Sequence, residues 1–339
     1  MHTTGLLLIV LGGMMEGLFA LPMIFTPKWS WENIWGAGSL VALVLVPWPL
    51  ALVTVPHLAD LYSSVPFHTI LLALIFGAGW GFGGLFFGLG VSSVGLALGT
   101  SLIMGLIAIG GSVVPLILLH QDQFSSRAGE ILIIGIATMV IGLVVCARAG
   151  SLKSGKMGAE KGKASLSGYG IGLVYCIAAG FLSALVNFAL IFGAPIAKPA
   201  IVRGLDPGTA NNAVWALVFT SGYLVNALYC VLKSFRERTF RNFFAQSAPR
   251  YWGWALIMGI LWAGGIVVYG RGASLEGALG PVFGFPIMLI ISILTGNAAG
   301  ALSGEWRNAP AAAKSNMALG VSVMVLAIVI LGYADYAIP

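Results

Sequence analysis

The sequence predicts an all-α polytopic membrane protein with ten transmembrane helices, arranged as an inverted repeat of five and five. Three observations lead to this fold class: the composition, the spacing of long apolar runs, and an internal repeat. Of the 339 residues, 59% are hydrophobic and 8% are charged, and the mean hydropathy is +0.98. Because an average soluble domain is about 25% charged, the chain lacks the polar surface that a soluble enzyme or a nucleic-acid-binding domain needs.

Ten apolar runs are each long enough to cross the hydrocarbon of a bilayer, which takes about 20 residues of helix. The first run has no Lys or Arg before it and no small-residue cleavage pattern, so we expect a retained helix and not a signal peptide. The runs lie near residues 5–26, 34–56, 69–90, 95–119, 128–147, 168–193, 210–233, 250–271, 276–303 and 315–336.

The basic residues predict the orientation of these spans. Of the 17 lysines and arginines, 13 fall in loops that follow odd-numbered runs and the other four in loops that follow even-numbered runs. Cytoplasmic loops carry the excess of basic residues. We therefore expect the odd-numbered loops in the cytoplasm and both termini in the periplasm, and we interpret the net charge of +6 as a topology signal.

An internal repeat relates the third and eighth runs. With residue n set against residue n+182, ten of the 23 positions from 73 to 95 are identical, and they include the pair Trp80 and Trp262. A unit of five spans is odd, so its second copy enters the membrane with opposite orientation, an architecture found mostly in transporters. The predicted organisation is a first repeat at 1–150, a basic cytoplasmic loop at 151–167 and a second repeat at 168–339.

No cofactor or metal is expected. The pattern Gly79-x-Gly81-x-x-Gly84 has the spacing of a dinucleotide-binding motif but lies inside a predicted span. The segment 150–157 resembles a phosphate-binding loop but ends in Met157, where a Ser or Thr should hold magnesium. The three cysteines are Cys146, Cys176 and Cys230. Their spacing is not typical of a disulfide framework or of a zinc site.

One group of residues keeps an enzymatic alternative open. His57, Asp60 and His68 share the predicted outer loop 57–68, where they offer acid-base chemistry to a membrane-surface enzyme. Neither a nucleophile nor metal-ligand spacing accompanies them, so the favoured interpretation is a solvated connector.

Glu16 is the one carboxylate near the middle of a predicted span. An acidic side chain there costs about 2.5–3.5 kcal/mol on insertion scales, and such residues usually face a cavity and serve function. We expect Glu16 to bind and release a proton during a transport cycle. The alternative is a structural carboxyl group.

Tryptophans and polar residues at membrane depth are the candidate ligands of a substrate. Trp80 and Trp262 lie among glycines at symmetry-related positions, and aromatic faces with hydrogen-bonding neighbours suit a sugar, which combines apolar C–H faces with hydroxyl groups. The polar candidates are Asn187, Tyr223, Asn226 and Tyr269. The alternative role for the tryptophans is plain helix packing, and the alternative role for the polar residues is hydrogen bonding between helices.

Four segments occur in order around the spans: KWSWENIW at 28–35, LVPW at 45–48, ARAGSLKSGKMG at 147–158 and GEWRNA at 304–309. They resemble the L-rhamnose:proton symporter family of the drug/metabolite transporter superfamily, and the resemblance covers nearly the whole chain. It implies a secondary active transporter of the bacterial inner membrane, not an enzyme, that takes up a deoxyhexose such as L-rhamnose with protons by alternating access. A carrier for another sugar or small metabolite is the alternative.

Overall fold

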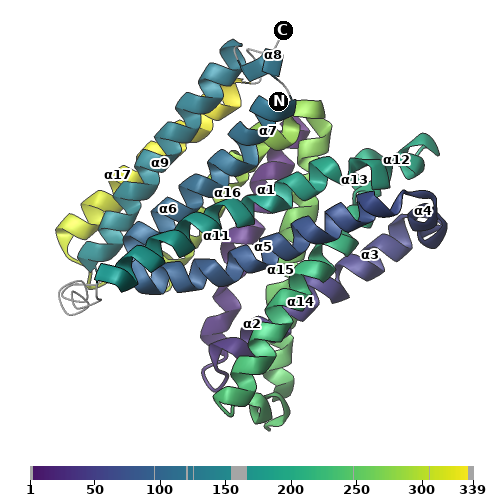
Figure 1. Ribbon diagram of the computed structural model, residues 1–339. Coiled ribbons are helices and arrows are strands. Elements are labelled where there is room, and N and C mark those ends of the chain that lie inside the picture. The colour runs from purple at the N-terminus through teal and green to yellow at the C-terminus, as the bar shows by residue number, and fades with distance from the viewer. Residues whose placement is uncertain are drawn as a thin grey trace. The chain divides into compact units, whose positions relative to one another are not determined.

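The computed structural model describes residues 3–94, 96–119, 121–124, 126–153, 166–246, 248–304 and 306–334 (Figure 1). All regular elements in these ranges are helices, which confirms the all-α fold class. Nine helices of the described part are long and apolar enough to cross a membrane. They are Thr3–Phe25, Trp31–Thr54, Phe67–Val91, Arg127–Lys153, Gly170–Val202, Pro207–Arg236, Ala248–Leu275, Gly280–Leu302 and Ala311–Tyr333.

The fourth predicted run, 95–119, contains a shorter apolar helix, Leu102–Leu118. The chain is thus a multi-pass membrane protein whose described part is all-helical and holds nine candidate spans, and the count of ten stays a prediction. Most of the predicted basic loop 151–167, namely residues 154–165, lies outside the described residues.

The chain forms two compact units. Unit 1 comprises Gly83–Ala184 and Ala278–Pro339, and unit 2 comprises His2–Phe82 and Leu185–Gly277. Each unit therefore contains residues from both predicted repeats. The boundaries of the repeats stay a prediction. The helices α5 (Phe67–Val94) and α11 (Leu166–Phe192) contribute to both units.

Unit 1 contains, besides parts of α5 and α11, the elements α6 (Leu96–Ala108), η3 (Ile109–Val113), α7 (Val114–Leu119), α8 (Gln121–Phe124), α9 (Arg127–Lys153), α16 (Gly280–Leu302) and α17 (Ala311–Ala334), with η5 (Gly277–Leu279) at its boundary. Unit 2 contains α1 (Thr3–Leu18), η1 (Leu21–Phe25), α2 (Trp31–Leu40), η2 (Val41–Leu45), α3 (Pro47–Thr54), α4 (Leu58–Ser64), α12 (Ala194–Val202), α13 (Pro207–Ala210), α14 (Asn212–Arg236), η4 (Phe240–Phe244) and α15 (Ala248–Leu275).

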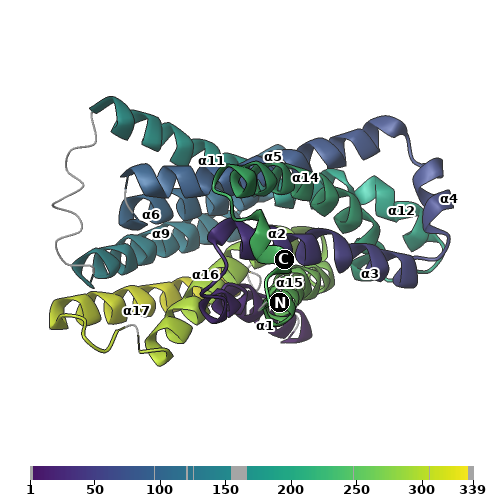
Figure 2. The same ribbon diagram turned by 90° about the horizontal axis from the view of Figure 1, so that it is seen from below.

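In unit 1, α9 and α17 pack side by side in antiparallel orientation (Figures 1 and 2). A Cβ atom placed on Gly142 would lie 2.5 Å from Cγ of Met324, and one placed on Gly320 would lie 2.5 Å from Sγ of Cys146. One glycine on each helix, Gly142 on α9 and Gly320 on α17, therefore allows the two helices to approach closely. Small residues serve this purpose between membrane helices, where lipid removes the hydrophobic drive for association.

The predicted run 34–56 is not one continuous α-helix. After α2 ends at Leu40, a π turn follows (η2), in which the N–H of Val46 donates to the carbonyl of Val41 at 2.9 Å, and α3 begins at Pro47. Proline has no N–H to continue the α-helical hydrogen bonding, and π turns occur as single turns inside α-helices. The length of the apolar run does not show this change, whereas Pro47 in the sequence marks it.

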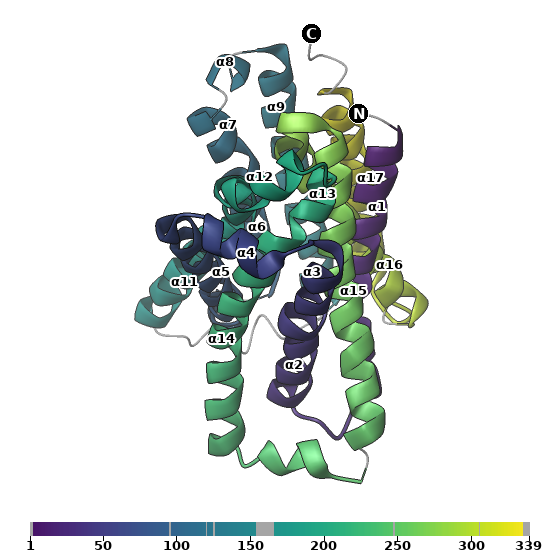
Figure 3. The ribbon, with the colours of Figure 1, turned by 90° about the vertical axis from the view of Figure 1, so that its right-hand side faces the viewer.

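In unit 2, α1 and α15 also pack in antiparallel orientation (Figures 2 and 3). A Cβ atom on Gly12 would lie 2.7 Å from the carbonyl oxygen of Gly265, and one on Gly272 would lie 2.7 Å from the carbonyl oxygen of Gly5. The two contacts are seven residues apart on each helix, so the backbones stay close over two helical turns. Any side chain larger than hydrogen at these positions requires the helices to separate.

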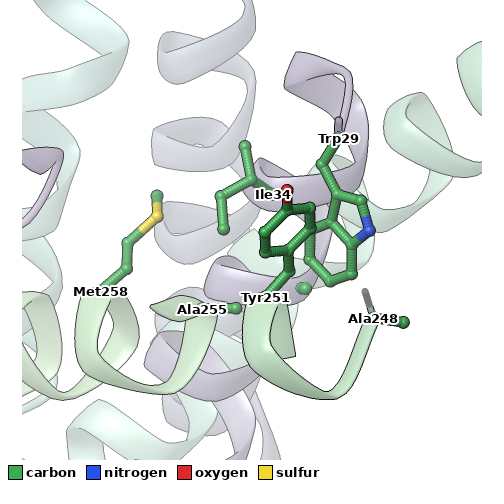
Figure 4. Packing of buried hydrophobic residues seen from close by; sticks show 7 residues of the cluster. Trp29, Ile34, Ala248, Tyr251, Ala255 and Met258 are labelled. Carbon is green, nitrogen blue, oxygen red and sulfur yellow. The ribbon is translucent and has the colours of Figure 1, made fainter. Parts of the chain in front are cut away.

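A buried aromatic cluster joins the beginnings of α2 and α15 (Figure 4). Trp29 is buried just before α2, and its ring lies edge-on to Tyr251, with 5.7 Å between centroids. Ile34 and Met258 complete the cluster together with three alanines, Ala37, Ala248 and Ala255. Edge-to-face ring pairs contribute about 0.5–1.5 kcal/mol beyond the burial of area, so these two helix ends are firmly joined.

We predict that Gly12→Ala lowers the thermal stability of the protein, because the new Cβ meets backbone atoms of α15 that cannot rotate away. Overpacking of this kind costs about 1–3 kcal/mol. The matched control is Gly253→Ala in α15, where an added Cβ has nothing within 4 Å. Thermal unfolding of the purified proteins in detergent measures the difference. Equal midpoints for the two variants would contradict the close contact.

Candidate functional site

All seven candidate site residues lie in the described part of the chain, and all belong to unit 2. They come from the helices α1, α5, α11, α14 and α15, which places them on five segments that are distant in sequence. They are Glu16, Trp80, Asn187, Tyr223, Asn226, Trp262 and Tyr269.

The two tryptophans related by the repeat are brought together. Trp80 of α5 and Trp262 of α15 stack with 5.4 Å between ring centroids and 29° between ring planes, and both side chains are partly exposed. Gly222 of α14 makes room for Trp80, since a Cβ atom there would lie 2.7 Å from two atoms of that ring.

Two further aromatic residues belong to this group, and the sequence analysis missed them. Phe219 of α14 is fully buried, and its ring centroid lies 6.0 Å from that of Trp80 and 5.1 Å from that of Trp262. On its other side it stacks on Trp215, with 5.0 Å between centroids and 10° between planes. Phenylalanine is common in any apolar run and gives no signal, and Trp215 is only one of seven tryptophans that fall within the predicted spans.

Glu16 of α1 lies beside the α15 backbone. Its residue as a whole is partly exposed, but its Oε1 atom is buried and accepts no hydrogen bond from the described residues. A Cβ atom on Gly265 would lie 3.2 Å from Cγ of Glu16. Gly265 follows Trp262 by three residues, so the two share a face of α15. Glu16 therefore meets α15 about one helical turn beyond Trp262.

Tyr269 and Asn187 form a polar pair between α15 and α11. Both are buried, and the Tyr269 hydroxyl donates to Oδ1 of Asn187 at 3.5 Å, a long hydrogen bond. Tyr269 also packs against α1, because a Cβ atom on Gly12 would lie 3.0 Å from its Cβ. Tyr269 therefore lies at the same α1–α15 contact as Glu16.

Asn226 uses its side chain to join helices. Its Oδ1 accepts a hydrogen bond from Nε1 of Trp35 at 3.1 Å, and its Nδ2 donates to the carbonyl of Gly222 at 3.0 Å. This geometry favours the structural alternative for Asn226. Tyr223, next to Gly222 on α14, is partly buried.

The three candidate acid-base side chains of the loop 57–68 are exposed. His57 and Asp60 are exposed, with 3.7 Å between Nδ1 and Oδ2, and His68 is exposed as well. Among the described residues, no group of three or more His, Cys, Asp or Glu side chains is placed to hold a metal ion. The loop contains the short helix α4 (Leu58–Ser64), which is anchored by the buried Leu61, and it ends where α5 begins at Phe67.

Comparison with known proteins identifies the family. The family model described as L-rhamnose-proton symport protein matches residues 2–337. Proteins named L-rhamnose-proton symporter from Escherichia coli O17:K52:H18 (strain UMN026 / ExPEC), Escherichia coli (strain 55989 / EAEC) and Shigella boydii serotype 18 are each 26% identical over 337 residues, which is 97% of this chain and 97% of the relative. The chain therefore belongs to the L-rhamnose-proton symport protein family, whose members are transporters and not enzymes.

Proposed function

We propose that this protein is a secondary active transporter that takes up L-rhamnose together with protons across the bacterial inner membrane. The observation that carries the proposal is the stacked pair of Trp80 and Trp262, with Glu16 packed against α15 about one helical turn beyond Trp262 and its Oε1 buried. The family of symporters and its curated relatives support the substrate and the coupling ion. Another sugar or small metabolite is the alternative substrate.

The proposed sugar site combines an aromatic surface with hydrogen-bonding groups. A deoxyhexose carries an apolar methyl group and C–H faces that suit the faces of Trp80 and Trp262, and hydroxyl groups that need polar partners. Asn187 of α11 supplies an amide, and Tyr269, about two helical turns after Trp262 on α15, supplies a phenol. Tyr223 and Asn226 of α14 complete the proposed set, with Asn226 acting through the helices it joins.

The proposed transport cycle is alternating access by two inverted repeats of five spans, the architecture of the drug/metabolite transporter superfamily. In that arrangement both termini are periplasmic, so the first span runs inward and the eighth runs outward. The antiparallel packing of α1 and α15 agrees with these directions. Sites at the interface of such repeats open first to one side of the membrane and then to the other.

Glu16 is the proposed proton-coupling residue. The carboxyl group would take a proton from the periplasmic side, let the loaded protein change conformation, and release the proton to the cytoplasm. A ligand shifts a two-state equilibrium only through its different affinity for the two states. Glu16 meets this condition if water or a hydrogen-bond donor reaches its buried Oε1 in one state and not in the other.

The test of the function is uptake into proteoliposomes. We expect radiolabelled L-rhamnose to accumulate when the lumen is more alkaline than the outside, and to equilibrate without accumulation when a protonophore is present. L-fucose and L-arabinose in the same assay report the specificity. Accumulation of L-rhamnose that ignores the pH gradient would refute the coupling, and transport of a different solute only would favour the alternative substrate.

We predict that Glu16→Gln abolishes accumulation driven by a pH gradient, because the amide keeps the shape of the side chain but cannot ionise. Binding of L-rhamnose and exchange of internal for external sugar should persist, since neither requires net movement of protons. The matched control is Glu237→Gln, which removes an exposed carboxylate from unit 2. A Glu16→Gln variant that accumulates sugar as well as the parent would show that another group couples the proton.

We predict that Trp262→Ala weakens sugar binding by about 1–3 kcal/mol, which is roughly 5- to 150-fold in Kd. The lost face of the indole is the physical reason. Trp254→Ala on the same helix is the matched control, because Trp254 stacks on Phe25 and not on the tryptophan pair. Equilibrium binding to both purified variants measures the effect, and an unchanged Kd in a folded Trp262→Ala protein would return the pair to a packing role.

A further inference from the structure

The connection between α14 and α15 lies at one end of unit 2 (Figure 3), and exposed arginines gather in and beside it. Residues 233–252 contain five basic residues and one acidic residue, Glu237, for a net charge of +4. Within this segment the exposed arginines are Arg236, Arg238, Arg241 and Arg250. The positive charge is therefore concentrated on a short stretch of backbone.

The remaining basic side chain of the segment is used inside the protein. Nζ of Lys233 lies 3.6 Å from Oε2 of the buried Glu32 and 5.3 Å from the ring centroid of Trp31. Arg236 has one weak, exposed contact of 3.9 Å to Glu237. For Arg238 and Arg241, no carboxylate in the described part of the chain lies within ion-pair distance. The arginines are thus available to an anion from outside.

An exposed apolar stripe runs along α14 toward these arginines. Leu224, Leu228, Leu232 and Phe235 are each more than 60% exposed and recur at intervals of four, four and three residues, which places them on one face of the helix. Such a face on a membrane-spanning helix contacts lipid chains. The stripe ends beside Arg236, so the arginines begin where the lipid-facing surface stops.

Aromatic residues continue the stripe into the connection. The ring of Phe235 stacks on that of Phe240, with 4.8 Å between centroids, and Phe244 is 78% exposed. Exposed aromatic rings beside basic side chains are typical of the level of the lipid headgroups.

The backbone that carries these side chains is held from within unit 2. Nε1 of Trp29 donates to the carbonyl of Asn242 at 3.0 Å, and Nδ2 of Asn33 donates to the carbonyl of Thr239 at 3.1 Å. The Thr239 hydroxyl donates to Oε1 of Glu32 at 2.6 Å. These bonds fix residues 239–242, so the arginines on either side are presented on a preformed surface.

We infer that this surface, defined by Phe235, Arg236, Arg238, Arg241 and Phe244, binds the phosphate headgroup of an anionic phospholipid. Guanidinium groups match phosphate oxygens by paired hydrogen bonds, and clustered basic residues beside a membrane span favour acidic lipids. Continuity with the lipid-facing stripe of α14 selects a lipid over a soluble anion or an acidic protein. The inference is independent of the transported solute and of the proton coupling.

Lipid retention by the intact, purified protein tests this surface. The protein in neutral detergent is titrated with dioleoyl phosphatidylglycerol or dioleoyl phosphatidylcholine, and native mass spectrometry counts the bound lipids. We expect phosphatidylglycerol to bind at least tenfold more tightly than phosphatidylcholine. The triple variant Arg236→Gln, Arg238→Gln, Arg241→Gln should lose this preference.

The matched control removes three exposed charges elsewhere, by Lys198→Gln, Arg203→Gln and Arg307→Gln, and should keep the preference. If the triple variant fails to fold, Arg241→Gln alone should reduce the preference severalfold. A preference that survives in folded variants overturns the inference. Displacement of the lipid by millimolar inorganic phosphate also overturns it, because the surface would then be a general anion site.

Discussion

The candidate site depends on the close approach of α1 and α15. Without side chains at Gly12 and Gly265, the two backbones come within contact distance, and this distance sets where the neighbouring side chains lie. Glu16 follows Gly12 by one turn and meets Gly265, while Tyr269 meets Gly12 from the other helix. Association of membrane helices depends on packing and hydrogen bonds, because lipid is as apolar as the helix surface. A wider separation of α1 and α15 would therefore have two effects. It would weaken the packing of the helices, and it would move the Glu16 carboxyl group away from the aromatic residues of α15.

Glycines of the same unit also allow indole rings to pack directly against helix backbones. Gly222 faces the ring of Trp80, and Gly270 faces the ring of Trp215, whose Nε1 would lie 3.5 Å from a Cβ placed there. Phe219 contacts all three of these tryptophans, since it stacks on Trp215 and packs against the stacked pair of Trp80 and Trp262. The high glycine content, 47 residues in 339, is thus consistent with large rings lying directly on helix backbones, an arrangement that places aromatic area at membrane depth without widening the bundle.

The sequence predicted those features that each segment must satisfy by itself in lipid. Apolar runs predict helices because backbone polar groups in hydrocarbon must be satisfied within their own segment, and the long helices of the structure follow those runs. The repeat register singled out Trp80 and Trp262, which the structure then brought into contact. The break at η2 was missed although Pro47 marks it in the sequence, because the prediction used only the length of the apolar run. The position of Phe219 could not be predicted, because it depends on which neighbouring helices face that residue.

Polar side chains within the spans separate into two kinds once their partners are known. Trp35 and Asn226 satisfy each other, as do Trp48 and Thr220, with 2.7 Å from Nε1 to Oγ1. Sequence alone could not separate such pairs from ligand-binding residues, because both present a polar group in an apolar run.

Glu16 belongs to the other kind, since its buried Oε1 accepts no hydrogen bond from the described residues. An unsatisfied polar atom in hydrocarbon is costly, and a protein can retain one where a proton, water or a ligand supplies the missing partner. The lack of an internal partner, more than position in the span, is therefore what distinguishes Glu16 from the polar residues that hold the helices together.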